Sequence, residues 1–173
     1  MNFFEIIEKR YSHKGRFLST PVPREKLVQI ASAGLSAPTG MNLQCVKLVI
    51  LPDRQAVQPL CDIAPTEGTL TAPAAIVVFT DKTTQNWKMD FQIEDYSAAT
   101  ENMLLAATAL GYVALWLDSP YFPADKQKAL CDLLNAPANY QLRTVIPIGL
   151  PDGECLKREK MPFDERVWFG EFS

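Results

Sequence analysis

The chain has 173 residues, of which 47% are hydrophobic and 21% charged, and its formal net charge is -3 at pH 7. These values predict one folded domain over residues 1–173 and argue against disorder. A mildly acidic chain gives no reason to expect nucleic acid or an anionic membrane as the main partner. No apolar run approaches the roughly 20 residues that a membrane span needs, and the amino terminus does not resemble a signal peptide. We therefore expect a cytoplasmic protein.

Cysteine and histidine restrict the chemistry that the side chains can supply. Cys45, Cys61, Cys131 and Cys155 are widely spaced, and His13 is the only histidine. Nothing in this spacing requires a disulfide framework, and a zinc site would lack its usual paired ligands. A catalytic triad would have to use His13 as its base. We expect a reduced protein without a metal.

The first half of the chain alternates helical and strand patterns. Apolar residues recur at helical spacing over Phe3–Lys9 and Arg24–Leu35. Val46–Leu51 has the pattern of a strand. A helix is predicted over Arg54–Ile63, because Asp53 is a suitable N-cap.

A polar loop is predicted over Pro65–Pro73, and a buried strand over the uninterrupted apolar run Ala74–Phe79. Asp90–Leu110 is the longest helical pattern, and Gly111 is its expected stop. From Ala98 onward, apolar or small residues cover most of this helix. Such a helix is buried on more than one side, either as a central core helix or at a subunit interface.

The last third predicts a strand over Tyr112–Leu117, an amphipathic helix over Ala124–Leu134 and a final strand over Leu142–Leu150. Pro147 indicates an edge or an irregularity in that strand. Residues 150–173 form a tail with four large apolar residues among its last seven. We expect this tail to dock on its own body or on a neighbouring chain. The pattern alone leaves parallel and antiparallel pairing open.

Ala37–Gln44 joins a predicted helix to a predicted strand and is rich in uncharged polar residues. Pro38 and Gly40 end the helix and allow backbone shapes that other residues resist. Three of its side chains are neutral and both donate and accept hydrogen bonds: Thr39, Asn42 and Gln44. This composition suits contact with the edge of a neutral heteroaromatic ring. A solvated turn is the alternative.

Two basic segments lie near opposite ends of the chain. In an extended backbone the alternating side chains of Arg10, Ser12 and Lys14 share one side, which suits a phosphate group. Arg158 and Lys160 repeat this spacing. A solvated charged face is the alternative for each segment, and the sequence leaves open whether they meet. The two commonest glycine-rich nucleotide loops are absent.

Taken in order, several segments match the motifs of one family. These segments are Arg10–Lys14, Pro21–Leu27, Ala37–Gln44, Asn102–Gly111, Ile148–Pro151 and Arg158–Pro162. They resemble the nitroreductase family of flavin enzymes and span nearly the whole chain. Tyr11 and Lys14 stand where that family often has arginine, and Gly15 makes the first loop one residue longer.

The resemblance implies an α+β fold, in which helices surround a mostly antiparallel central sheet. It implies a homodimer in which the C-terminal arm, residues 150–173, crosses to the partner. FMN would be the cofactor, NADH or NADPH the electron donor, and a nitro compound, quinone, flavin or enone the acceptor. Because the flavin does the chemistry, no catalytic side chain is assigned. A flavin-binding carrier or sensor is the alternative, and a flavin-free interaction protein is a third interpretation.

The resemblance also assigns cofactor contacts by position. The FMN phosphate and ribityl chain would be bound by the two basic segments, through Arg10, Ser12, Lys14, Arg158 and Lys160, and Tyr11 would also bind the cofactor. The flavin ring would be contacted, partly from the other subunit, by Pro38, Thr39, Asn42 and Gln44. The backbone near Asp118 and Ser119 would face flavin N5.

Aromatic residues are the candidates for lining the substrate side of the site. They are Trp87, Phe91, Tyr121 and Phe122, and core packing is the alternative for each. His13 is either a proton donor or substrate contact beside the first basic segment, or a surface residue without a role. We favour the surface position for His13.

Overall fold

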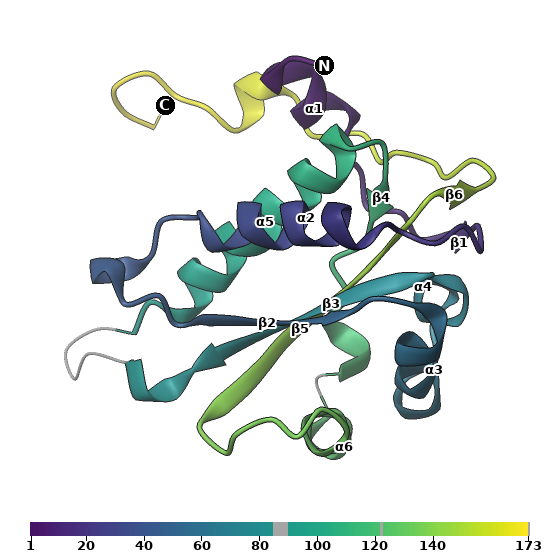
Figure 1. Cartoon of the computed structure of the whole chain (residues 1–173). Coiled ribbons are helices and arrows are strands. Elements are labelled where there is room, and N and C mark those ends of the chain that lie inside the picture. Colours follow the sequence, from purple (N-terminus) through teal and green to yellow (C-terminus); the bar gives the residue numbers. More distant parts are fainter. Residues whose placement is uncertain (85–89, 122, 173) are drawn as a thin grey trace.

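The computed structural model describes residues 1–84, 90–121 and 123–172, and its centre is a four-stranded sheet (Figure 1). The strands, in spatial order, are β2 (Val46–Leu51), β3 (Ala74–Asp81), β5 (Tyr140–Gly149) and β4 (Val113–Ala114). Every neighbouring pair in this sheet is antiparallel. The predicted α+β fold with a mostly antiparallel sheet is confirmed.

Two layers of helices cover the sheet (Figure 1). They are α2 (Arg24–Leu35) and α5 (Gln92–Ala109) on one face, and α3 (Arg54–Ile63) and α6 (Ala124–Leu133) on the other. β3 serves both layers, because successive strand residues point to opposite faces. Ile76 packs into the α2–α5 core and Val77 into the α3–α6 core, and residues 74–80 are all buried. The buried strand predicted from this apolar run is confirmed.

Shorter elements surround these layers. They are α1 (Phe3–Lys9), β1 (Arg16–Phe17), η1 (Gly40–Asn42), α4 (Glu67–Thr71), η2 (Lys82–Thr84), η3 (Ser119–Tyr121), β6 (Pro151–Asp152) and η4 (Phe163–Glu165). β1 and β6 pair antiparallel, with Arg16 opposite Asp152. This small second sheet brings the two ends of the chain together.

The prediction of a loop over Pro65–Pro73 is wrong, because α4 lies inside it. A capping box starts this helix: the Thr66 hydroxyl accepts from the Thr69 N–H at 3.1 Å, and the Thr69 hydroxyl accepts from the Thr66 N–H at 3.0 Å. A helix of five residues is too short to give a readable apolar stripe.

Pro147 lies in an inner strand, so the edge interpretation is wrong and the irregularity is observed. Its carbonyl accepts from the Leu115 N–H at 3.3 Å. In an antiparallel strand the nitrogen of a residue faces the same neighbour as its carbonyl, so the missing N–H lies on the β4 side. Regular pairing of β4 accordingly covers only Val113–Ala114, although Leu117 still bridges to Val145. The predicted strand Tyr112–Leu117 is thus regular only in part.

α5 is buried against α2 and the sheet, as the predicted long helix requires. A Cβ at Gly34 of α2 would lie 2.7 Å from Cγ of Met103, so glycine permits this close crossing. Gly111 follows the helix with φ of 84°, the left-handed stop that the sequence indicates. Ile93 on the outer side of α5 is 60% exposed. One side of α5 therefore packs in the core, and a subunit interface on the other side stays a prediction.

The C-terminal segment leaves the helix layers and runs beside α1 (Figure 1). The Lys157 ammonium donates to the Glu8 carbonyl. Apart from this contact, the segment is open to solvent: Leu156 is 94% and Phe169 90% exposed, and none of the α1 residues is buried. The apolar tail therefore does not dock on its own body, and docking on a neighbouring chain stays a prediction. Within the described residues, no helix has the length and apolar character to cross a membrane.

Candidate functional site

A cation-rich cavity of about 180 Å³ lies between the first loop and the C-terminal segment. It is lined by Arg10, Tyr11, Ser12, Lys14, Cys155, Leu156, Lys157, Arg158 and Lys160. Five of these side chains are cations, and none of the described lining residues is acidic. The structure thus brings together the two basic segments, including the five residues assigned to the phosphate and ribityl chain and Tyr11. Such a set of charged and hydroxyl donors fits a phosphate group.

The first loop is fixed by its contact with the sheet. Ser12 forms an isolated bridge with Ala114 of β4, and the His13 N–H donates to the Ala114 carbonyl at 3.1 Å. Glu101 of α5 holds the Arg10 side chain in place through an ion pair, in which Nε of Arg10 lies 3.1 Å from Oε1 of Glu101. This ion pair uses Nε, which leaves the terminal nitrogens of the guanidinium for a bidentate contact with an oxyanion.

His13 is fully buried, so the expected surface position is wrong. Its Nε2 lies 2.8 Å from the Arg16 carbonyl oxygen, and its ring packs edge-on against Phe17 with centroids 4.8 Å apart. A Cβ at Gly15 would lie 3.2 Å from Cε1 of His13, so the glycine allows the loop to fold over the ring. His13 does not line the cavity.

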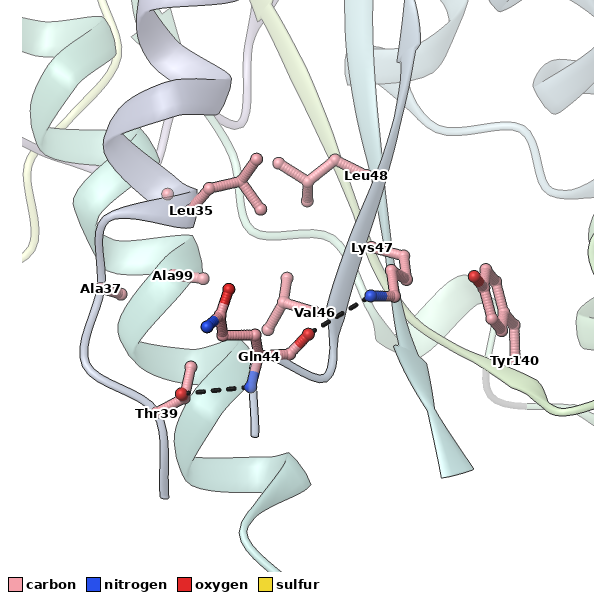
Figure 2. A pocket seen from close by; sticks show the side chains of 10 residues that line it. Leu35, Ala37, Thr39, Gln44, Val46, Lys47, Leu48, Ala99 and Tyr140 are labelled. Atoms are coloured by element: carbon pink, nitrogen blue, oxygen red, sulfur yellow. Dashed lines mark hydrogen bonds between the residues drawn. The ribbon is translucent and has the colours of Figure 1, made fainter. Parts of the chain in front are cut away.

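Thr39 and Gln44 line a second cavity, of about 540 Å³, between the end of α2 and β2 (Figure 2). Its lining residues are Gly34, Leu35, Ala37, Thr39, Gln44, Val46, Lys47, Leu48, Ala99 and Tyr140. The Gln44 N–H donates to the Thr39 hydroxyl at 3.2 Å, and its side-chain amide donates to Oδ1 of Asn42 at 3.3 Å. Pro38 and Asn42 adjoin this cavity in the chain without lining it. Among the described residues of one chain, the two cavities share no lining residue.

The backbone of this turn is strained. Met41, Asn42 and Gln44 have φ of 53°, 57° and 52°, in the left-handed region. Asparagine tolerates this region, whereas each of the other two residues costs on the order of 1 kcal/mol there. Such strain persists only where surrounding contacts impose it, and it is concentrated at functional sites.

Two residues near the start of α5 hold the turn in place. Asp95 accepts from the Gly40 N–H at 2.7 Å and from the Cys45 thiol at 3.3 Å. Burial, followed by the bond to Asp95, raises the pKa of the Cys45 thiol to about 12, so the thiol is the donor. Phe91 packs beneath the turn, where a Cβ at Gly40 would lie 2.2 Å from its Cγ. Phe91 therefore supports the turn from below.

Asp118 and Ser119 lie in neither cavity. The Asp118 carbonyl accepts from the Tyr121 N–H at 2.8 Å, which closes the turn η3. Tyr121 itself packs in the α3–α6 core, where burial raises the pKa of its hydroxyl, so core packing is the interpretation that holds for it. Trp87 and Phe122 lie outside the described residues. No group of three potential metal ligands occurs in the described part of the chain.

Comparison with known proteins identifies the family. The sequence model of the Nitroreductase family matches residues 7–67 and 64–150, which is most of the chain. The chain belongs to the nitroreductase family. The resemblance of its motifs to that family is thereby confirmed.

Individual relatives within the nitroreductase family are similar in sequence and fold. A protein of Archaeoglobus fulgidus, provisionally named an NADH dehydrogenase/NAD(P)H nitroreductase, is 36% identical over 132 residues, 75% of each chain. An FMN-dependent nitroreductase of Clostridium difficile R20291 has a TM-score of 0.82 at 26% identity and covers 98% of this chain and 99% of its own. A provisionally named nitroreductase of Desulfovibrio desulfuricans, solved in complex with FMN, has a TM-score of 0.78 at 26% identity. The match covers 100% of this chain and 99% of that relative.

Sequence reasoning missed four residues that the structure adds to these sites. Cys155 and Lys157 line the cation-rich cavity, Glu101 pairs with Arg10, and Asp95 anchors the turn. Lys157 was visible as a neighbour of the second basic segment. An acidic residue near the start of a helix has a general explanation in the helix dipole, so Asp95 carried no separate signal.

Proposed function

We propose that this member of the nitroreductase family is an FMN-dependent oxidoreductase that uses NADH or NADPH and a small electron acceptor. The observation that carries the proposal is the cation-rich cavity, where two segments about 145 residues apart supply five cations and the Ser12 hydroxyl. A dianionic phosphate is the ligand that best matches this donor set. Two similar solved structures, the FMN-dependent nitroreductase of Clostridium difficile and the FMN complex of the Desulfovibrio desulfuricans protein, support the same cofactor.

Different residues of the chain would bind different parts of FMN. Arg10 and Arg158 would form bidentate contacts with the phosphate, and Lys14 and Lys160 would add point charges. Thr39 and Gln44 would present neutral donors and acceptors to the ring edge. Asp118 and Ser119 would offer backbone groups near the reacting end of the ring. When bound, FMN supplies the redox chemistry, by taking electrons from the nicotinamide and passing them to the acceptor.

A homodimer would complete the site. Among the described residues of one chain, the cation-rich cavity shares no lining residue with the cavity beside the polar turn (residues 39–45). A second subunit would bring its own polar turn or its own cation-rich cavity to the same FMN. The exposed apolar side chains of α1 and of the C-terminal segment support a self-association surface, because contiguous exposed apolar patches mark interaction sites. The four free cysteines support placing the protein in a reducing compartment such as the cytoplasm.

The visible absorption spectrum of the purified protein tests the proposal first. We expect flavin bands equimolar with the chain and release of FMN on heating, followed by oxidation of NADH or NADPH when a quinone or nitroarene is added. A protein that contains no flavin and takes up none would contradict the proposal. Bound FMN without nicotinamide oxidation would instead support a flavin carrier or sensor.

Alkylation of Cys155 gives an independent test of the phosphate site. Cys155 is half-buried at the cation-rich cavity, whereas Cys45 and Cys61 are buried. We expect iodoacetamide to modify Cys155 first and added FMN to slow this reaction several-fold, because the ligand covers the thiol. Mass spectrometry of the four cysteine peptides measures both rates.

Cys131 is the internal control for this experiment. It is half-buried on α6, it lies outside the cavity, and burial raises the pKa of its thiol. Its slow modification should not respond to FMN. Equal protection of Cys131 and Cys155, or protection of neither at saturating FMN, would remove the cofactor from this cavity.

A further inference from the structure

Asp95 is the only acidic side chain that is buried among the described residues, with 3% of its surface exposed. It lies in the first turns of α5, and its two oxygens accept hydrogen bonds from different ends of one segment. Oδ1 accepts from the Gly40 N–H at 2.7 Å, and Oδ2 accepts from the Cys45 thiol at 3.3 Å. A single carboxyl group therefore spans the polar turn.

The Arg143 guanidinium hydrogen-bonds to groups other than this carboxyl group. Its positive charge lowers the pKa of the Cys45 thiol, as the smallest of several influences. The guanidinium donates to the Thr80 hydroxyl at 2.8 Å and to Oε1 of Gln92 at 3.2 Å. No ion pair of Asp95 is found in the described part of the chain. The two donors of the turn are thus the partners that Asp95 orients.

The residues between these donors would not hold their shape unaided. Met41, Asn42 and Gln44 all have left-handed φ, a conformation that an unrestrained turn leaves readily. Thr39 lies just before Gly40 and Gln44 just before Cys45, and the Gln44 N–H donates to the Thr39 hydroxyl at 3.2 Å. Fixing Gly40 and Cys45 fixes the direction of both side chains.

We propose that Asp95 is a positioning residue, which holds the turn in the shape that contacts the flavin ring and acts through the Gly40 N–H and the Cys45 thiol. The assignment rests on the proposed function, because it needs a bound flavin to have a consequence. It predicts a defect in ring binding and none in phosphate binding, since the cation-rich cavity contains neither Asp95 nor its partners.

The Asp95→Asn variant tests the assignment with two flavins. Asparagine keeps the shape but turns an NH₂ group toward one of the two donors, so the turn loses an anchor. We expect the affinities for FMN and for riboflavin, which has no phosphate, to fall by the same factor, about tenfold for one lost charge-assisted bond. The visible spectrum and midpoint potential of the bound flavin should shift with them. Glu94→Gln is the matched control, because Glu94 is exposed on the same helical turn.

The Cys45→Ala variant separates this role from packing. If the thiol acts through Asp95, its loss lowers both affinities when Asp95 is present and adds little in the double variant with Asp95→Asn. Independent packing effects would instead add. Cys45→Ala also keeps the proposal testable if circular dichroism shows that Asp95→Asn does not fold.

Three results would overturn the assignment. Affinities of Asp95→Asn within about twofold of the parent, well under the cost of one such bond, would show that the carboxyl group positions nothing. A loss for FMN alone, or an additive double variant, would place the effect elsewhere. A parent chain that binds neither flavin would refute the proposed function itself. That outcome differs from failure of the assignment alone, in which the parent binds both flavins and the Asp95→Asn variant binds them with the same affinities.

Discussion

Replacing Arg158 and Lys160 together with alanine is expected to lower the affinity for FMN by about 100-fold, because each charge-assisted contact with phosphate contributes roughly 1.5 kcal/mol at an exposed site. Both side chains are exposed in the C-terminal segment and line the cation-rich cavity. Riboflavin affinity should change little, because that molecule has no phosphate. The measurement is a fluorescence titration of the apoprotein with each flavin.

Lys9→Ala is the control for charge alone. Lys9 is exposed and adjacent to Arg10 in the chain, but it does not line the cavity. Its loss should change FMN affinity by less than about threefold, because exposed cations outside direct contact are screened by salt. If Lys9→Ala weakened FMN as much as the double variant, a diffuse positive field and not a built site would explain binding. Equal losses for FMN and riboflavin in the double variant would contradict a phosphate contact.

Removing residues 161–173 is expected to convert a dimer into a monomer. The removed segment carries Phe163, Trp168, Phe169 and Phe172, of which Phe169 is 90% and Phe172 86% exposed within one chain. Burying several large apolar side chains against a partner stabilises a dimer by about 1.5–3 kcal/mol each, so their loss should dissociate it at micromolar concentration. Light scattering during size-exclusion chromatography measures the mass directly.

Two further variants make this result specific. Phe169→Ala combined with Phe172→Ala keeps the chain length and should weaken the dimer in the same direction. Leu133→Ala on α6, also a partly exposed apolar side chain at 40%, should leave the mass unchanged. A truncated chain that elutes as a stable dimer would show that the arm does not hold the subunits together. A full-length chain that is monomeric would reject the dimer altogether.

Strong periodic or apolar patterns made most of the fold predictable. β3 is an apolar run long enough to be recognised directly. α3 begins at Arg54, directly after Asp53, whose carboxylate accepts from the Ala56 N–H at 2.9 Å as an N-cap should. α4 was missed because its start depends on two threonine hydroxyls in a segment without apolar spacing. The partial regularity of β4 depends on Pro147 in another strand, which no local pattern reports.

The chemical groups of the site could be predicted from the sequence, but their arrangement in space could not. The residue types at Arg10, Ser12 and Lys14 indicate an oxyanion site on their own. These three residues lie near Arg158 and Lys160 because β1 pairs with β6, which is a contact between distant parts of the sequence. The burial of His13 depends on a glycine that lets the loop close over the ring. Such tertiary contacts override what a short segment suggests.

The left-handed backbone at Met41 affects how this protein would respond to selection for heat resistance. Glycine adopts that conformation without a steric penalty, so a library screened only for folding would accumulate glycine at position 41. The same change would widen the range of shapes open to the turn and weaken the orientation of Thr39 and Gln44. Under the proposed function, thermostability and cofactor retention therefore select for different residues at this position, and a screen should measure both.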